Sequence, residues 1–225
     1  MKLLKLAEPP SPSDLPKPGG QAVVLIHGMM SGRRSMRMIA EELIAAKFHV
    51  TNWGYATLTR SIRRHADDLG RVLRDHLADP RFDHLHLVGH SMGCIIVRQT
   101  LQSVAMPVGS RVVMLAPPNA GSRLTRIPAG PLASWFPPIA ELSEAQDSLV
   151  NRLPPPVGIE VGVIAADRDR IVELSSTHLA TQQDHVVVSA THQRLPLVPQ
   201  AVRQVCEFLK AGCFYREDVL RRRAA

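Results

Sequence analysis

One serine between two glycines has the surroundings that nucleophilic chemistry requires. Ser91 lies in the motif GHSMG at 89–93, after the apolar run 84–90 and before the helical pattern of 92–104. A strand followed at once by a helix puts such a serine on a sharp turn, where small residues leave room for the neighbouring backbone. The helix N-terminus then favours a developing oxyanion. The alternative is a glycine-flanked turn in which the serine only caps the helix.

A serine hydroxyl needs a general base, and the order of elements selects one of the ten histidines. In a parallel sheet, functional groups gather beyond the carboxyl ends of the strands. His192 comes directly after the last predicted strand, whereas His185 begins that strand at its opposite end. His27 also ends a strand, but it precedes the serine and does not fit the chain order given below. We therefore expect His192 to be the base.

Two aspartates follow the fifth predicted strand. Asp167 directly ends the strand, whereas Asp169 stands further into the loop, where its side chain can turn back across the rim. A carboxylate at that place can fix the imidazole tautomer and stabilise the imidazolium. Asp169 is thus the predicted acid. The three residues then follow one another in the chain as Ser91, Asp169 and His192. Catalytic triads on unrelated folds differ in this order, so the order serine–acid–histidine carries information about the fold.

The segments that must position these residues alternate between strand and helix patterns. Short β-branched apolar runs predict buried strands, and apolar stripes at helical spacing predict amphipathic helices. The predicted strands are 21–27, 48–55, 84–90, 111–116, 157–166 and 185–191, and the predicted helices are 34–47, 61–79, 92–104 and 198–209. This alternation predicts an α/β fold with a mostly parallel central sheet and helices on both faces.

The chain of 225 residues is long enough for one domain with a substantial core. Residues 1–20 hold five prolines and are predicted to be an extended arm before a single domain over 21–225. The segment 117–156, between the fourth and fifth strands, holds nine of the 18 prolines. A connection this long indicates a functional insertion such as a cap or lid. We expect a helix or two within 137–153.

Composition excludes several classes of partner. The net charge is +7, but the arginines are scattered and aromatic residues make up only 4% of the chain, which argues against nucleic-acid binding. No apolar run approaches the roughly 20 residues of a membrane span, although the basic charge is compatible with peripheral contact with an anionic membrane. The first residues do not fit a signal peptide, and three cysteines favour free thiols. We expect a cytoplasmic protein, and nothing in the sequence fixes its oligomeric state.

Four motifs together resemble the α/β-hydrolase superfamily, in particular its small bacterial lipase- and esterase-like members. They are LIHGM at 25–29, LVGHSMGC at 87–94, DRIV at 169–172 and DHVVVSATH at 184–192. The resemblance covers about residues 21–210, and it lacks the HGGG form of some esterases. It implies a serine hydrolase that cleaves carboxylic esters through an acyl-serine, with a small cap over 117–156. The roles implied are Ser91 as nucleophile, His192 as base, Asp169 as acid, and the backbone N–H groups of Met29 and Met92 as oxyanion hole.

The sequence says less about the substrate. Metal motifs such as H-E-x-x-H and paired C-x-x-C are absent, as is a glycine-rich phosphate loop, so we expect no metal and no cofactor. A small acyl ester, short or medium in its acyl chain, is the expected substrate. Met30, Trp135 and Phe136 could line an apolar acyl slot, but Trp135 and Phe136 could equally be core residues that fix the lid. Action on thioester or amide bonds, acyl transfer, and non-catalytic binding stay open as alternatives.

Overall fold

The central element of the molecule is one six-stranded sheet. The computed structural model describes residues 19–123 and 137–216, so nearly all of the predicted arm, as well as Trp135 and Phe136, lies outside the described residues. The strands are β1 (Gly20–Ile26), β2 (His49–Trp53), β3 (Phe82–His90), β4 (Arg111–Leu115), β5 (Glu160–Ala166) and β6 (Asp184–Val188). Their order is β2-β1-β3-β4-β5-β6, and every neighbouring pair is parallel.

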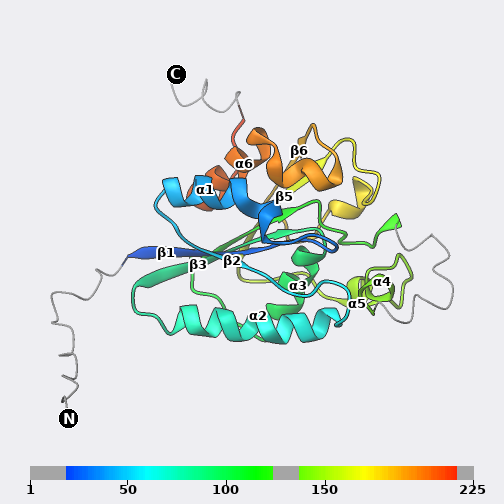
Figure 1. Cartoon of the computed structure of the whole chain (residues 1–225), viewed down its shortest axis with the longest axis horizontal. Helices are drawn as coiled ribbons and strands as arrows, with labels where there is room; N and C mark the ends of the chain where they lie inside the picture. The colour runs from blue at the N-terminus through cyan, green and yellow to red at the C-terminus, as the bar shows by residue number, and fades with distance from the viewer. Residues whose placement is uncertain (1–18, 124–136, 217–225) are drawn as a thin grey trace, which may run out of the picture.

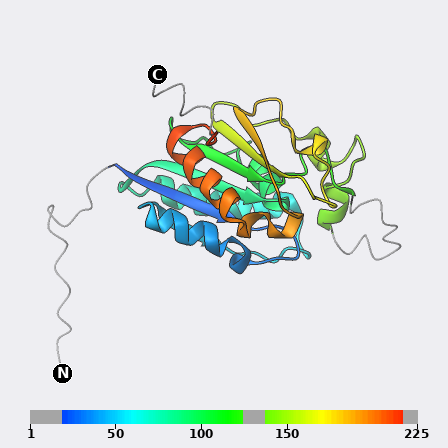
Figure 2. The same cartoon turned by 90° about the horizontal axis from the view of Figure 1, so that it is seen from above.

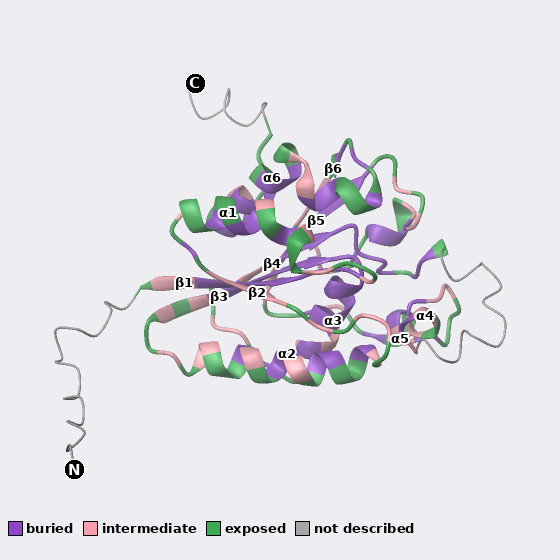
Figure 3. Ribbon diagram, in the orientation of Figure 1, coloured by how far each residue is buried: buried purple, intermediate pink, exposed green. Residues whose placement is uncertain are grey.

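Helices cover both faces of this sheet (Figures 1 and 2). The helices α1 (Arg37–Ala45) and α6 (Pro199–Ala211) lie on one face, and α2 (Ile62–Leu77) and α3 (Met92–Thr100) lie on the other. Side chains alternate along a strand, so Val24 packs on the α2–α3 side and Val23 on the α1–α6 side, both fully buried. Figure 3 shows this burial on both faces of the sheet. The predicted α/β fold with a parallel sheet between helical layers is confirmed.

The helix ends differ from the prediction by a few residues. The predicted helix 34–47 is a 3-10 turn (Arg33–Met36) followed by α1, and the predicted helix 92–104 ends at Thr100. Other ends follow the local signals. The Ser61 side chain accepts a hydrogen bond from the N–H of Arg64 at the start of α2, and Gly212 is left-handed (φ 73°) at the end of α6.

The described part of the segment 117–156 contains two short helices, α4 (Pro137–Glu141) and α5 (Leu149–Arg152), at one end of the molecule (Figure 1). The predicted helix or two within 137–153 is therefore present. The Glu141 carboxylate accepts a hydrogen bond of 2.7 Å from the backbone N–H of Ile62, the first residue of α2. This contact ties the segment to the main body of the protein.

The strand order creates a switch point beside β1. The neighbours of β1 are β2 and β3, and the register pairs Ile26 at the end of β1 with Gly89 near the end of β3. The loops that follow these two strands therefore start side by side, at the place where open α/β sheets bind their ligands. Among the helices of the described residues, none has the length and apolar character to cross a bilayer.

Candidate active site

Ser91 occupies a strained turn between β3 and α3. Its backbone angles are φ 52° and ψ −121°, a conformation that side-chain-bearing residues rarely adopt. The Ser91 N–H donates to the carbonyl of Leu115 (2.9 Å), and the Ser91 carbonyl accepts from the N–H of Cys94 (2.9 Å). These two bonds hold the turn against its strain and keep Ser91, which is 9% exposed, at the carboxyl edge of the sheet.

The glycines around Ser91 are required by close backbone approach. A Cβ atom on Gly93 would lie 2.4 Å from the carbonyl oxygen of Ile26, and one on Gly89 would lie 2.9 Å from the Cys94 nitrogen. A Cβ atom on Gly28 would lie 3.1 Å from the Cβ of Ser91. The glycines of the GHSMG motif therefore leave room for neighbouring backbone, and the loop after β1 packs directly on Ser91.

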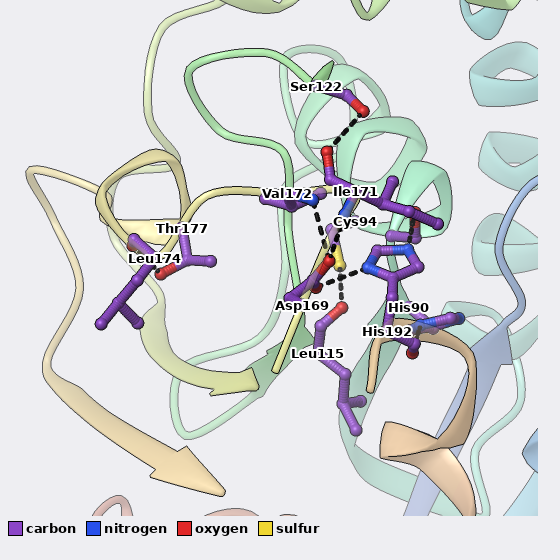
Figure 4. A network of polar contacts seen from close by, with 11 residues as sticks. His90, Cys94, Leu115, Ser122, Asp169, Ile171, Val172, Leu174, Thr177 and His192 are labelled. Carbon is purple, nitrogen blue, oxygen red and sulfur yellow. Dashed lines mark hydrogen bonds and ion pairs between the residues drawn. The ribbon is translucent and has the colours of Figure 1, made fainter. Parts of the chain in front are cut away.

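The structure brings the three predicted side chains together from separate loops. The Nε2 of His192 lies 2.9 Å from the Ser91 hydroxyl oxygen, and its Nδ1 lies 2.6 Å from the Asp169 carboxylate. Because the carboxylate only accepts, Nδ1 carries the proton and Nε2 is left to accept the hydroxyl proton of Ser91. His192 begins a short 3-10 helix, His192–Leu197, after β6. The contact between Asp169 and His192 is visible in Figure 4.

The Asp169 carboxylate is buried yet remains charged. Its other oxygen accepts hydrogen bonds from the backbone N–H groups of Ile171 (2.8 Å) and Val172 (2.9 Å), as Figure 4 shows. Burial alone would raise the pKa of Asp169, but the hydrogen bonds from His192 and from the two N–H groups lower the pKa below its usual value. A negative charge next to the imidazole stabilises the imidazolium form.

Asp167 takes no part in this arrangement. Its carboxylate accepts a hydrogen bond from the N–H of Ala190 (3.1 Å) and lies 3.5 Å from the Arg168 guanidinium. The Asp167 side chain is 44% exposed, whereas that of Asp169 is 3% exposed. Of the two aspartates at the rim, only Asp169 contacts His192.

Two backbone N–H groups near Ser91 are available to a ligand. Met92 is the first residue of α3, so its N–H has no acceptor within the helix. The N–H of Met29, in the loop that packs on Ser91, has no acceptor among residues 19–123 and 137–216. Donors of this kind bind oxyanions, and these are the two to which the family resemblance gives that role.

A cavity of about 530 Å³ opens in front of Ser91. Its apolar wall consists of Met29, Met30, Pro118, Ile139, Leu142 and Ile171. The predicted pocket residue Met30 is therefore found there, while the predicted Trp135 and Phe136 lie outside the described residues. Ile139 and Leu142 belong to the segment 117–156, so this segment contributes to the wall of the cavity. Within the part of the chain that the structure describes, no cluster of His, Cys, Asp or Glu could hold a metal ion.

Comparison with known proteins identifies the family. A model described as the alpha/beta hydrolase family matches residues 23–208, most of the chain. This protein belongs to the alpha/beta hydrolase family. Membership supports a hydrolase activity in general and agrees with the resemblance that the sequence motifs carry. A search of curated proteins by sequence found no match.

Solved structures share the fold of this alpha/beta hydrolase at low sequence identity. The mature lipase BlEst2 of Bacillus licheniformis is 13% identical with a TM-score of 0.66, covering 89% of this chain and 95% of that chain. The lin2722 gene product of Listeria innocua is 17% identical with a TM-score of 0.63, covering 88% and 96%. The Pyrococcus furiosus esterase Pf2001 is 20% identical with a TM-score of 0.57, covering 84% and 82%. At these identities the likeness shows the fold alone.

This alpha/beta hydrolase also has a site residue that the sequence did not reveal. His90, next to Ser91, is fully buried, and its Nε2 lies 3.1 Å from the carbonyl oxygen of His192, to which it donates. Burial lowers the pKa of His90 to about 3, so the ring is neutral. His90 thus holds the backbone of His192 without adding charge. The contact joins residues 102 positions apart, and no local pattern could predict it.

Proposed function

We propose that this protein is a serine hydrolase that cleaves carboxylic esters through an acyl-serine intermediate. The observation that carries the proposal is the chain of hydrogen bonds from Ser91 to His192 (2.9 Å) and from His192 to Asp169 (2.6 Å). A serine is a weak nucleophile unless a positioned base takes its proton, and a second group orients that base. The family supports hydrolysis in general, and the ester bond is the specific part of the proposal.

The reaction follows from the positions of the atoms. The Ser91 oxygen attacks the ester carbonyl carbon while the Nε2 of His192 takes the hydroxyl proton and Asp169 stabilises the imidazolium. The N–H groups of Met29 and Met92 hold the oxyanion of the tetrahedral intermediate. The intermediate collapses, and the leaving alkoxide takes the proton from His192 and departs as an alcohol. A water molecule then repeats the sequence on the acyl-serine, which releases the carboxylic acid and restores Ser91.

The substrate class is proposed from the cavity in front of Ser91. Its apolar wall suits the acyl group, because burial of methylene groups there contributes about 0.8 kcal/mol each. A volume of about 530 Å³ lies within the range of small-molecule sites. We propose that 117–156 forms a small cap over this cavity and that esters of short or medium acyl chains are the preferred substrates.

Two experiments, done one after the other, test first the nucleophile and then the class of bond that is cleaved. A fluorophosphonate probe should add one mass increment to the intact protein, and the increment should be absent in folded Ser91→Ala. Initial rates on p-nitrophenyl esters from acetate to palmitate then test ester hydrolysis. A folded wild-type protein without an adduct would contradict the proposal. An adduct without ester hydrolysis would contradict the ester bond and leave thioesters, amides or acyl transfer as the reaction. Product analysis with and without an alcohol acceptor then distinguishes these alternatives.

A further inference from the structure

The peptide bond between Gly28 and Met29 fixes the direction of the Met29 N–H relative to that of the Gly28 carbonyl. The carbonyl of Gly28 and the N–H of Met29 belong to the same planar unit, and the described residues contain no cis peptide bond. In a trans peptide the C=O and N–H point in opposite directions. Whatever holds the Gly28 oxygen therefore also sets the direction of the Met29 N–H, the proposed oxyanion donor.

Two side chains hold the Gly28 oxygen. The Ser31 hydroxyl donates to it at 2.9 Å, and the Nδ1 of His27 lies 3.0 Å from it. Because a carbonyl only accepts, Nδ1 must be the protonated nitrogen of His27. The backbone N–H of Tyr55 then donates to the Nε2 of His27 at 3.5 Å. Burial lowers the pKa of His27, which agrees with this neutral tautomer.

The loop after β2 fixes the residues on either side of this peptide. The Tyr55 hydroxyl donates to the carbonyl of His27 at 2.7 Å, and the two rings stack at 4.4 Å. Thr57, two residues later, accepts a hydrogen bond of 3.1 Å from the N–H of Met30. The β2 strand is the parallel neighbour of β1, so its loop starts where the loop of Gly28 starts. The Gly28–Met29 peptide thus lies between two residues, His27 and Met30, whose backbone groups are held by hydrogen bonds to the loop after β2.

The backbone of Met30, the residue after this peptide, has an unfavourable conformation. Met30 has φ 54°, in the left-handed region that residues with a side chain rarely occupy. Such a residue costs on the order of 1–3 kcal/mol and persists only where its surroundings determine it. The hydrogen bonds from Ser31 and to Thr57 are the surroundings that do so here.

We propose that Ser31 and Tyr55 are positioning residues that aim the Met29 N–H at the oxyanion. Ser31 acts by holding the Gly28 oxygen, and Tyr55 acts by holding His27. This inference rests on the proposed function, because an oxyanion forms only if Ser91 attacks a carbonyl. Neither residue reacts. Ser31 lines the cavity, but its hydroxyl is engaged by the Gly28 oxygen, so the loss of either hydroxyl should affect the transition state and leave substrate binding unchanged.

Steady-state kinetics on p-nitrophenyl butyrate with Ser31→Ala and Tyr55→Phe test this role. Loss of one oxyanion donor lowers kcat by roughly 10²–10³ in other enzymes, so a misaimed donor should lower it by about tenfold. KM should stay within about twofold, as expected for an interaction made only in the transition state. Inhibition by a butyl trifluoromethyl ketone, whose serine adduct carries an oxyanion, should weaken about as much as kcat falls. Ser31→Thr, which keeps the hydroxyl, should restore both.

Ser103 provides the matched control. Its hydroxyl donates to the carbonyl of the residue three positions earlier, Thr100 (3.2 Å), as that of Ser31 does to Gly28, but Ser103 follows the end of α3 opposite to Ser91. Ser103→Ala should therefore keep the wild-type ratio of trifluoromethyl ketone affinity to KM. The inference would be overturned by a raised KM with unchanged kcat in Ser31→Ala, by an equal loss of kcat in Ser103→Ala, or by a loss of kcat that a lower Tm explains. An active wild type with unchanged Ser31→Ala and Tyr55→Phe overturns this inference alone, whereas a wild type without a phosphonate adduct overturns the proposed function too.

Discussion

At the scale of single residues, the proposed chemistry depends on which carboxylate faces His192. Asp169 contacts the Nδ1 of His192 at 2.6 Å, and Asp167 lies outside this contact, paired with Arg168. An asparagine at 169 would present an NH₂ group that can donate to Nδ1, which favours the tautomer with the proton on Nε2. Nε2 could then no longer accept the Ser91 proton.

Asp169→Asn should therefore lower kcat by about 10³–10⁴, the order seen when a triad aspartate becomes its amide. Asp167→Asn should change kcat by less than about threefold, since that side chain is close to half exposed and does not contact His192. Both are measured on a soluble p-nitrophenyl ester at pH 7.5, with circular dichroism to confirm folding. If Asp167→Asn were the more damaging change, Asp169 would not be the acid.

Local rules are enough to predict the three triad residues from the sequence. The flanking glycines and the place between strand and helix indicate Ser91, and the rule that strand ends meet at one edge indicates His192 and Asp169. These three side chains do come together. Contacts such as His90 with His192, or Tyr55 with His27, join distant loops through single hydrogen bonds. No periodicity or motif in the sequence specifies such bonds, so only the structure could reveal them.

At the scale of elements, the Glu141 contact joins the proposed cap to the main body. The carboxylate at the end of α4 accepts from the Ile62 N–H at 2.7 Å, at the positive end of α2. Burial raises the pKa of Glu141, although the Ile62 N–H opposes this shift. Because Ile139 and Leu142 adjoin Glu141 and line the cavity, this contact should also fix the shape of the acyl site.

Glu141→Gln should lower the free energy of unfolding by about 1 kcal/mol, the size of a lost charge–helix interaction. It should also broaden the rate profile over p-nitrophenyl esters of graded chain length. Ser61→Ala is the matched control, because it removes the other side-chain cap of α2 without touching α4. The control should lower stability by a similar amount and leave the profile unchanged. An unchanged profile in Glu141→Gln would show that α4 does not shape the acyl site.

The elements themselves were predicted from periodicity, but their ends and their spatial order were not. Apolar patterning identified all six strands and the four long helices. It could not distinguish the 3-10 turn Arg33–Met36 from the first turn of α1, since Met36 of the turn is buried in the same cluster as Ile39 and Leu43 of α1. The order β2-β1-β3, which brings the loops after β1 and β3 together, depends on tertiary packing that the pattern of a single strand does not encode.

At the scale of the whole molecule, buried histidines link the stability of the sheet to pH. His86 in β3 accepts a hydrogen bond from the N–H of Arg111 (3.0 Å) through Nδ1 and donates to Gln21 (3.2 Å) through Nε2. Both nitrogens are occupied only in the neutral ring. Burial, together with the Arg111 charge, lowers the pKa of His86 to about 4. In the unfolded chain the pKa of a histidine is about 6.5.

Between pH 6.5 and about 4, the unfolded chain binds a proton at this position that the folded protein does not. The free energy of unfolding should therefore fall as the pH falls through this window, by up to about 3 kcal/mol from His86 at 1.36 kcal/mol per pKa unit. His90, whose pKa burial lowers to about 3, adds to the same slope. The lowered pKa of Asp169 contributes only below about pH 4, where the unfolded carboxylate begins to protonate.

Urea unfolding of the wild type and of His86→Gln at pH 7.5, 6.0 and 5.0 measures this slope. Glutamine cannot take up a proton, so the variant should be less stable at pH 7.5 but lose less stability on acidification. His49→Gln is the control, because His49 is an exposed residue at the start of β2, and this variant should keep the wild-type slope. An unaltered slope in His86→Gln would mean that protonation elsewhere in the molecule governs its acid sensitivity.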